Sequence, residues 1–232
     1  MGKLGILGGM GPMATQLLYK MIIDNTEASK DQEHLDMIIL NHASMPDRTE
    51  AINSGRTDEI FELLSKDIKM LADNGCNVIA IPCNTSHFLY KRLSDSTDAT
   101  VINMIRQSVE DLKETNPFAK KIAILATDGT LKTNLYRIEC EALGLEAIYP
   151  EPEIQKIVMD IIYNQIKKGE RGNPKDFEKI DQHLRKRGCD GAILACTELS
   201  CYKDFNPLPD FYIDALESLC KKSIILSGGN LK

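Results

Sequence analysis

The stretch NGCNVIAIPCNT at residues 74–85 returns without a gap as RGCDGAILACTE at residues 187–198. A glycine, two cysteines and an apolar run hold the same places in both copies. A second pair of stretches, KLGILGGMG (3–11) and KIAILATDG (121–129), is separated by nearly the same length of chain. Any two βαβ units share Gly-capped helices and apolar strands, but chance rarely places cysteine twice at the same depth. The repeat therefore predicts two similar halves.

Around the repeat, apolar runs bounded by Gly, Pro and Asn alternate with amphipathic stretches of helix length. This alternation is typical of βαβ units with a mainly parallel sheet. Pro12 suits a first helical turn, and glycines stand where several helices are expected to end. Those glycines are Gly75, Gly144, Gly169 and Gly188. Strands are expected near 4–7, 36–41, 77–81, 100–103, 121–126, 145–149 and 191–195, and helices over 12–28, 56–74, 103–114, 129–143, 153–168 and 175–187.

The expected fold class is α/β, with two similar Rossmann-like lobes that each contain a parallel sheet. A pseudo-twofold axis would relate the lobes, and the active site would lie in the cleft between them. Residues 1–115 form the expected N-terminal lobe and residues 116–205 the C-terminal lobe. The segment 206–232 is expected to cross back and complete the first lobe.

Composition excludes several classes of protein. The 232 residues are 43% hydrophobic and 27% charged, which are ordinary values for a folded globular protein. The formal net charge is −6 and no basic stripe is visible, so nucleic acid is not an expected partner. No apolar signal or membrane segment is recognised, so we expect a cytoplasmic protein without a membrane partner. The seven cysteines lack CxxC spacing, so neither a disulfide framework nor a metal site is expected.

Two cysteines stand where open α/β sheets place their sites. Cys83 and Cys196 each follow the expected carboxyl end of a parallel strand and precede a candidate helix start. The partial positive charge of a helix start lowers the pKa of a thiol, and the backbone N–H groups and threonine hydroxyls that follow could hold an oxyanion. Cys201 stays ambiguous. The remaining cysteines are expected to act as small core side chains, and they are Cys76, Cys140, Cys189 and Cys220.

Four other features have two interpretations each. The stretch Gly9–Ala14 fits the dinucleotide pattern G-x-G-x-x-A, but the acidic residue expected after the second strand is missing, so an anion-binding turn is favoured. Arg48 either clamps a carboxylate or is a solvated loop residue. Thr127 either faces the ligand or is a plain N-cap. His87 is either the partner of Cys83, one helical turn away, or a structural histidine.

Five motifs give the chain a resemblance to the aspartate/glutamate racemase family. They are GGMGPMAT (8–15), MPDRT (45–49), PCNTSH (82–87), ATDGT (126–130) and ACTELS (195–200), in order over nearly the whole chain. The resemblance implies a cofactor-independent, PLP-free isomerase that acts on an amino acid and forms a homodimer. It also implies that Cys83 and Cys196 are the catalytic acid and base.

The same resemblance nominates the residues that surround the substrate. Arg48 matches the family's clamp for the side-chain carboxylate, and IYNQIKKG (162–169) resembles a segment that nominates Lys167 as a second carboxylate contact. Cys196-Thr197-Glu198 stands where glutamate racemases tend to have Cys-Thr-His, which favours aspartate over glutamate as the substrate. The other substrate-binding candidates are Gly9, Met10, Thr15, Asn84, Thr85 and Thr127.

Two alternative functions remain. One is another reaction of the same superfamily, such as hydantoin racemisation or maleate isomerisation. The other is a non-catalytic ligand-binding or redox-sensing protein that uses a reactive cysteine. A redox sensor would form a disulfide or sulfenate under mild peroxide as its main response, whereas a racemase would lose activity.

Overall fold

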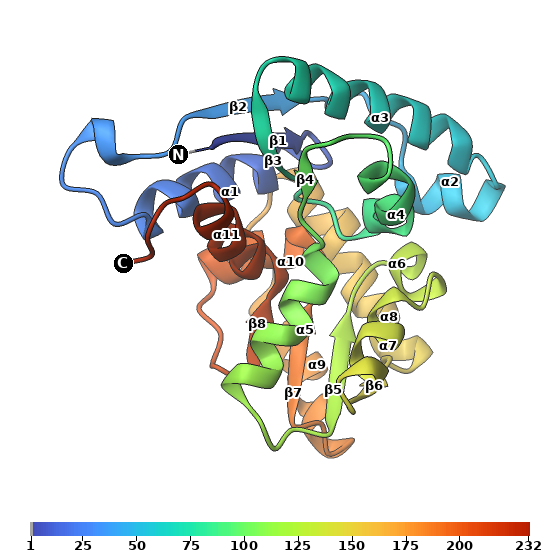
Figure 1. Ribbon diagram of the computed structural model, residues 1–232. Coiled ribbons are helices and arrows are strands. Elements are labelled where there is room, and N and C mark those ends of the chain that lie inside the picture. Colours follow the sequence, from blue (N-terminus) through green and yellow to red (C-terminus); the bar gives the residue numbers. More distant parts are fainter. Residues whose placement is uncertain (1) are drawn as a thin grey trace. The chain divides into compact units, whose positions relative to one another are not determined.

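The computed structural model describes residues 2–232 and divides into two compact units. The first unit runs to Met104 and also contains Leu216–Lys232, and the second unit is Ile105–Ala215. Each unit contains one four-stranded parallel sheet (Figure 1). Among the described residues, no helix has the length and apolar character needed to cross a membrane.

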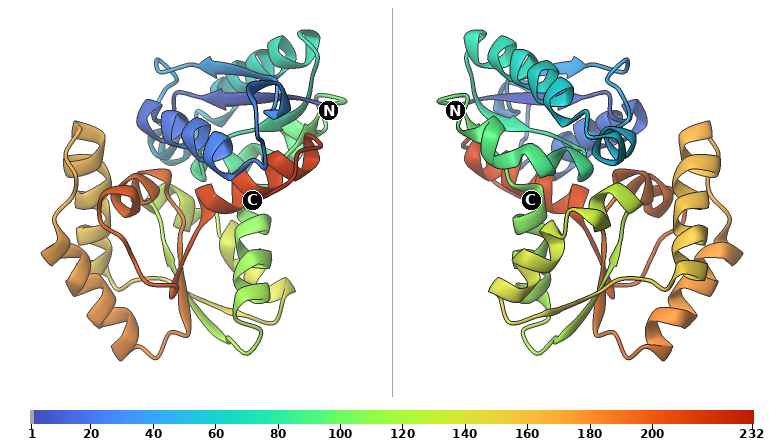
Figure 2. Two further views of the ribbon diagram at one scale, coloured as in Figure 1. Left: turned by 90° about the vertical axis from the view of Figure 1, so that its left-hand side faces the viewer. Right: turned by 90° about the vertical axis from the view of Figure 1, so that its right-hand side faces the viewer.

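The sheet of the first unit has the strand order β2-β1-β3-β4. Its strands are β1 (Lys3–Gly8), β2 (Met37–Asn41), β3 (Cys76–Ala80) and β4 (Thr100–Val101). All three strand pairs are parallel, and β1 is buried from Leu4 to its end because helices cover both faces. Figures 1 and 2 show α3 on one face of this sheet and α1 with α11 on the other. The helical segments are α1 (Pro12–Asn25), η1 (Asp31–Glu33), α2 (Arg48–Ser54), α3 (Thr57–Asp73), η2 (Thr85–Leu89), α4 (Tyr90–Ser94) and α11 (Ala215–Leu226).

The sheet of the second unit has the order β6-β5-β7-β8, the same order as the first with each strand replaced by its counterpart. Its strands are β5 (Lys121–Leu125), β6 (Glu146–Ile148), β7 (Gly191–Leu194) and β8 (Tyr212–Asp214). Figure 2 shows α8 and α9 on one face and α5 with α7 on the other. The helical segments are α5 (Met104–Thr115), α6 (Asp128–Lys132), α7 (Leu135–Ala142), α8 (Pro152–Asp160), a π-helical turn (Ile161–Gln165), a 3-10 turn (Ile166–Lys168), α9 (Pro174–Lys186) and α10 (Thr197–Phe205).

The predicted strands are all present, and the shared strand order confirms that the sequence repeat is a structural repeat. The repeated stretches place β3 and β7 at equivalent positions. β3 lies beside β1, and β7 lies beside β5. β8 was not predicted, because its residues were assigned to the segment 206–232 that was expected to return to the first lobe. It pairs with β7 through Ala192↔Tyr212, so residues up to Ala215 belong to the second unit and only Leu216–Lys232 return to the first.

The boundary between the units also lies earlier than residues 115 and 116. α5 buries Ile105, Val109 and Leu112, and its Ser108 hydroxyl donates to the Tyr136 hydroxyl of α7 over 3.4 Å. These apolar positions attach the helix to the second sheet, which explains why residues 105–115 belong to the second unit.

The expected helix ends are confirmed at four glycines, whose φ angles lie between 68° and 86°. Two helices expected to be continuous are interrupted. Asn134 takes a left-handed conformation with φ of 56° and separates α6 from α7. The helix that begins at Pro152 changes to a π turn at Ile161, and one more residue per turn there alters the direction of the side chains that follow.

Candidate active site

Cys83 lies just past the carboxyl end of β3. Its backbone N–H donates to the carbonyl of Ile81 over 2.7 Å, and its side chain is 5% exposed. A 3-10 turn starts at Thr85, directly after Asn84, and both of these residues are buried. The thiol is therefore held at the edge of the sheet where parallel α/β proteins bind ligands.

His87 is a structural histidine that holds the backbone of Cys83. Its ring is buried, with Nδ1 2.9 Å from the Cys83 carbonyl oxygen and Nε2 3.1 Å from the Met104 backbone nitrogen. Nε2 also lies 3.2 Å from the Ile102 carbonyl oxygen. Since the Met104 N–H donates to Nε2, we assign the proton of the neutral ring to Nδ1, which donates it to the Cys83 carbonyl oxygen. Burial lowers the pKa of His87, which keeps the ring neutral. The ring bonds to the backbone carbonyl of Cys83, which favours the structural interpretation of His87 over a catalytic partnership with the thiol.

We expect His87→Asn to lower the free energy of unfolding of the first unit. We also expect that free energy to depend less on pH in the acid range. The native ring resists protonation, so the unfolded chain takes up the proton first when the pH falls below about 6.5. The contribution of the wild-type His87 ring to stability is therefore complete above that pH and is lost below it. Urea unfolding at several pH values should show a loss of about 1–3 kcal/mol at neutral pH and a smaller acid loss in the variant. An unchanged acid slope would contradict this account.

The turn between β1 and α1 is closed by Thr15. The Thr15 hydroxyl accepts from the Gly9 N–H over 2.9 Å and donates to the Gly11 carbonyl over 3.0 Å. Gly9 has φ of 93°, and a Cβ there would lie 2.5 Å from the backbone of His42, so only glycine fits. Two predicted substrate-binding residues, Gly9 and Thr15, therefore form the turn itself.

Arg48 is neither in a loop nor solvated, which corrects one of its two interpretations. Asp47 caps α2 by accepting from the Glu50 N–H over 2.9 Å, so Arg48 opens a helix. Its guanidinium is buried and donates to the carbonyls of Pro46 over 2.9 Å and of Met10 over 3.1 Å. Arg48 thus ties its own segment to the glycine turn.

A His–Asp pair beside the same turn was missed from the sequence. His42 Nδ1 lies 2.6 Å from the Asp67 carboxylate, and the backbone N–H of His42 donates to the Gly8 carbonyl over 3.1 Å. The two partners come from β2's end and from α3, and no spacing rule links such distant positions.

Cys196 occupies the corresponding place in the second unit, at the N-cap of α10. Its thiol is 6% exposed and donates to the Glu198 carboxylate over 2.9 Å. Burial and the charge of Glu198 raise the pKa of Cys196 well above its ordinary value. The expectation that the helix start lowers this pKa is wrong, because burial and the adjacent carboxylate outweigh the helix. Cys196 therefore rests as the thiol. The next residue, Thr197, is buried.

Lys167 lies on the other side of Glu198. Its ammonium is 4.0 Å from the Glu198 carboxylate and 4.2 Å from the centre of the Tyr163 ring. The π turn and the 3-10 turn carry these two residues, and the buried Gln165 side chain anchors the following loop by accepting from the Asn173 N–H over 2.7 Å. The ammonium of Lys167 is therefore held in place between the Glu198 carboxylate and the Tyr163 ring.

Thr127 is the N-cap of α6, which confirms the second of its two interpretations. The Thr127 hydroxyl accepts from the Thr130 N–H over 3.3 Å, and Asp128 begins the helix. Within residues 2–232, no group of three or more His, Cys, Asp or Glu side chains is close enough to hold a metal ion.

The repeated α/β units, each with a buried cysteine at the carboxyl end of an equivalent strand, define a duplicated α/β protein with a thiol-bearing half-site in each unit. The chain belongs to the Asp/Glu/hydantoin racemase family, whose model matches residues 7–208. It is therefore an enzyme of an isomerase family.

Comparisons with known proteins give the same family. The chain is 26% identical over 230 residues to the broad specificity amino-acid racemase RacX of Bacillus subtilis, covering 95% of this chain and 96% of that one. The structure is similar to the aspartate racemase of Picrophilus torridus, with a TM-score of 0.84, 27% identity, and coverage of 100% and 96%. It also shares its fold with an aspartate racemase homologue of Pyrococcus horikoshii, with a TM-score of 0.78, 24% identity, and coverage of 98% and 99%.

Proposed function

We propose that this protein is a cofactor-independent racemase that inverts the α-carbon of aspartate, with glutamate as a second substrate, and that Cys83 and Cys196 are its two proton-transfer groups. The observation that carries the proposal is the equivalence of the two thiols. Each lies just past one of the equivalent strands β3 and β7, and each is buried. Inversion requires removal of the α-proton from one face and delivery to the other, and two such groups perform it with little motion.

The proton balance of the proposed reaction is simple. A Cys83 thiolate takes the α-proton and becomes a thiol, while the Cys196 thiol gives its proton to the opposite face and becomes a thiolate. For the other enantiomer the roles exchange. The hydrogen bond from Cys196 to Glu198 supports the resting thiol, and the Glu198 carboxylate gives the proton an acceptor when Cys196 must act as the base.

Charge on the substrate must be neutralised for the α-proton to leave, because no bound group acts as an electron sink in this proposal. Lys167 is a cation held near Cys196 through Glu198, and Arg48 is a cation held at the glycine turn near the end of β1. We assign carboxylate binding to these two side chains, together with the backbone N–H groups that follow the cysteines. The aspartate racemase at 27% identity supports aspartate, and the broad specificity relative supports a wider range.

Proton NMR in D2O without added PLP tests the proposal. Purified protein should remove the α-proton signal of L- and D-aspartate, and chiral analysis should find the opposite enantiomer with deuterium at the α-carbon. Hydroxylamine, which removes PLP from enzymes that use it, should leave the rate unchanged. Absence of exchange on aspartate and glutamate, with turnover of a 5-substituted hydantoin or of maleate instead, would transfer the assignment to another reaction of the family.

Replacement of Glu198 by glutamine should move the ionisation of Cys196 to lower pH. The carboxylate charge disfavours the thiolate, so its removal lowers the thiol pKa, although burial continues to raise it. Iodoacetamide alkylation of Cys196, followed by peptide mass spectrometry over a pH series, measures this shift. Glu178→Gln removes one exposed charge from α9 and is the matched control. A shift to higher pH in the Glu198 variant would contradict the assignment.

We also propose that the protein works as a cytoplasmic homodimer, as the family resemblance implies. Light scattering behind a sizing column should give twice the mass of the single chain. A mass equal to one chain at micromolar concentration would refute the dimer without bearing on the reaction.

A further inference from the structure

A buried pair of polar side chains in the second unit, Ser200 and Asp214, has no part in the proposed chemistry. The Ser200 hydroxyl donates to the Asp214 carboxylate over 2.6 Å, and both residues are 1% exposed. Ser200 lies in the first turn of α10, four residues after Cys196, and Asp214 is the last residue of β8. Burial of a carboxylate is costly in free energy unless hydrogen bonds hold it, so the pair calls for a physical reason.

The first unit contains an equivalent contact. The repeat that aligns Cys83 with Cys196 also aligns His87 with Ser200, because each lies four residues after its cysteine. Nε2 of His87 accepts from the Met104 N–H over 3.1 Å, just past the end of β4. β4 and β8 are the corresponding edge strands of the two sheets. In both units, therefore, the side chain four residues after the cysteine bonds to the chain at the end of the edge strand.

The registers of the edge strands agree with this equivalence. Val101 of β4 pairs with Ile79 of β3, and Tyr212 of β8 pairs with Ala192 of β7. The repeat aligns Ile79 with Ala192. The segments that follow Val101 and Tyr212 are therefore equivalent too, and Asp214 lies in the second of them.

The hydrogen bond between Ser200 and Asp214 anchors the start of α10. Cys196 is the N-cap of this helix, so the position of its thiol follows the position of the first turn. Ser200 joins that turn to β8, and β8 pairs with β7, the strand that precedes Cys196. The chain before Cys196 and the chain after it are thus both tied to β8.

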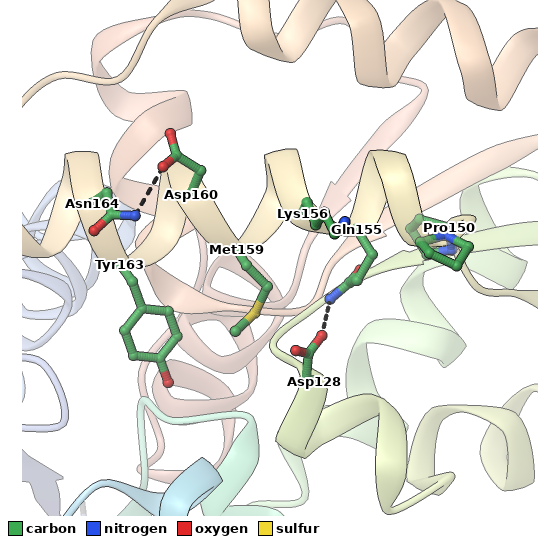
Figure 3. A pocket seen from close by; sticks show the side chains of 9 residues that line it. Asp128, Pro150, Gln155, Lys156, Met159, Asp160, Tyr163 and Asn164 are labelled. Atoms are coloured by element: carbon green, nitrogen blue, oxygen red, sulfur yellow. Dashed lines mark hydrogen bonds between the residues drawn. The ribbon is translucent and has the colours of Figure 1, made fainter.

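The large pocket of the second unit gives the pair no other role. It opens between α8 with the π turn and Asp128 of α6, and its volume is about 640 Å³ (Figure 3). Among the residues that the structure describes, its lining includes neither Ser200 nor Asp214. A ligand in that pocket would not contact the pair, so ligand binding there does not explain it.

We propose that Ser200 and Asp214 are positioning residues of the second half-site, whose hydrogen bond fixes Cys196 for proton transfer as the His87 ring fixes Cys83. The inference rests on the proposed racemase function and adds two residues to it. The two units meet the same requirement with different side chains. The first uses a neutral ring bonded to backbone groups, and the second uses a hydroxyl bonded to a carboxylate.

Exchange of the α-proton in D2O, measured separately for L- and D-aspartate, tests the role of Ser200. Ser200→Ala removes the donor, so it should slow about tenfold the exchange of the enantiomer that Cys196→Ser fails to exchange. Exchange of the other enantiomer should stay within about twofold of the wild-type rate, because Cys83 keeps its anchor. For racemisation, kcat should fall about tenfold and KM should change less than about twofold, since a displaced base affects the chemical step more than binding.

Three further variants control the measurement. Asp214→Asn keeps an oxygen that accepts from the Ser200 hydroxyl, so it should retain at least about half of the wild-type rate. Ser108→Ala removes an equally buried hydroxyl of the second unit whose partners lie on α5 and α7, and it should exchange both enantiomers at the wild-type rate. His87→Asn should give the mirror result, with slow exchange of the enantiomer that depends on Cys83.

A second measurement does not depend on the reaction. Iodoacetamide alkylation, followed by peptide mass spectrometry, compares Cys83 with Cys196 in the same sample. Loss of the anchor in Ser200→Ala should expose the Cys196 thiol and raise its alkylation rate at least about threefold, with the rate of Cys83 unchanged. Thermal unfolding followed by circular dichroism should show that each variant is folded at the assay temperature.

The outcomes separate the positioning role from the function. Equal losses for both enantiomers, or equal changes of alkylation at both cysteines, would mean that the whole fold has loosened and would overturn the inference. Wild-type exchange and alkylation in Ser200→Ala would overturn it as well. If the wild-type protein exchanges no amino acid, the proposed function fails, and the alkylation rates still decide whether Ser200 holds Cys196.

Discussion

Cys83→Ser and Cys196→Ser are each expected to abolish racemisation, with kcat for aspartate reduced by at least about 10³-fold. A serine hydroxyl has nearly the shape of a thiol but ionises far less readily, so it neither removes the α-proton nor returns one at neutral pH. Chiral chromatography after incubation with either enantiomer measures the loss. Near-normal turnover in either variant would exclude the two-base scheme.

In D2O, the same serine variants should lose racemisation but can retain exchange of the α-proton of one enantiomer. Abstraction on one face needs only one base, so a variant that keeps the relevant thiol can still exchange the α-proton of one enantiomer without inverting it. Cys201→Ala and Cys76→Ala are matched controls, because both thiols are buried in the same units and neither follows a strand end. They should racemise aspartate at close to the wild-type rate. A large loss in a control would indicate that cysteine packing, and not proton transfer, explains the serine variants.

The two thiols were predictable because the repeat places them by topology. In a parallel sheet the carboxyl ends of adjacent strands lie on one edge, so a cysteine just past such a strand is placed before any tertiary contact is known. The ionisation of Cys196 was not predictable. It depends on burial and on the direction of the Glu198 side chain, which are properties of the folded unit.

Arg48 shows a readable signal that was overlooked. Asp47 and Glu50 form a D-x-x-E pattern, which is a common start of a helix, and the pattern places Arg48 in a helical turn and not in a loop. The contact from its guanidinium to Met10 joins positions 38 residues apart, and no local pattern encodes such a contact. The contact between His42 and Asp67 also joins residues far apart in the sequence, so no local pattern predicts it.

The change from an α-helix to a π-helix before Lys167 was predictable only in part. Periodicity predicted a continuous helix over 153–168, which is correct for the path of the chain and wrong for the direction of its last side chains. One extra residue in the turn decides where Lys167 and Tyr163 point. The family resemblance nominated Lys167, but the direction of its side chain could be assigned only from the folded structure.

Arg48→Ala should lower kcat/KM for aspartate at least about 100-fold and reduce the free energy of unfolding by about 2–4 kcal/mol. The stability loss follows because the buried carbonyls of Met10 and Pro46 lose a charged donor. The activity loss follows from the proposed contact with the substrate carboxylate. Arg48→Lys keeps the charge but lacks the forked donors, so it should recover only part of either loss.

Asparagine separates the two roles of Arg48, because it has the shape of aspartate without the side-chain charge. If Arg48 binds that carboxylate, the variants should lose more exchange activity with aspartate than with asparagine. An equal loss with both amino acids would mean that Arg48 acts only by holding the glycine turn. Arg56→Ala is the matched control, since Arg56 is half exposed and pairs with Glu50 over 2.7 Å. Surface pairs of this kind contribute about 0–1 kcal/mol, so this variant should retain both stability and activity.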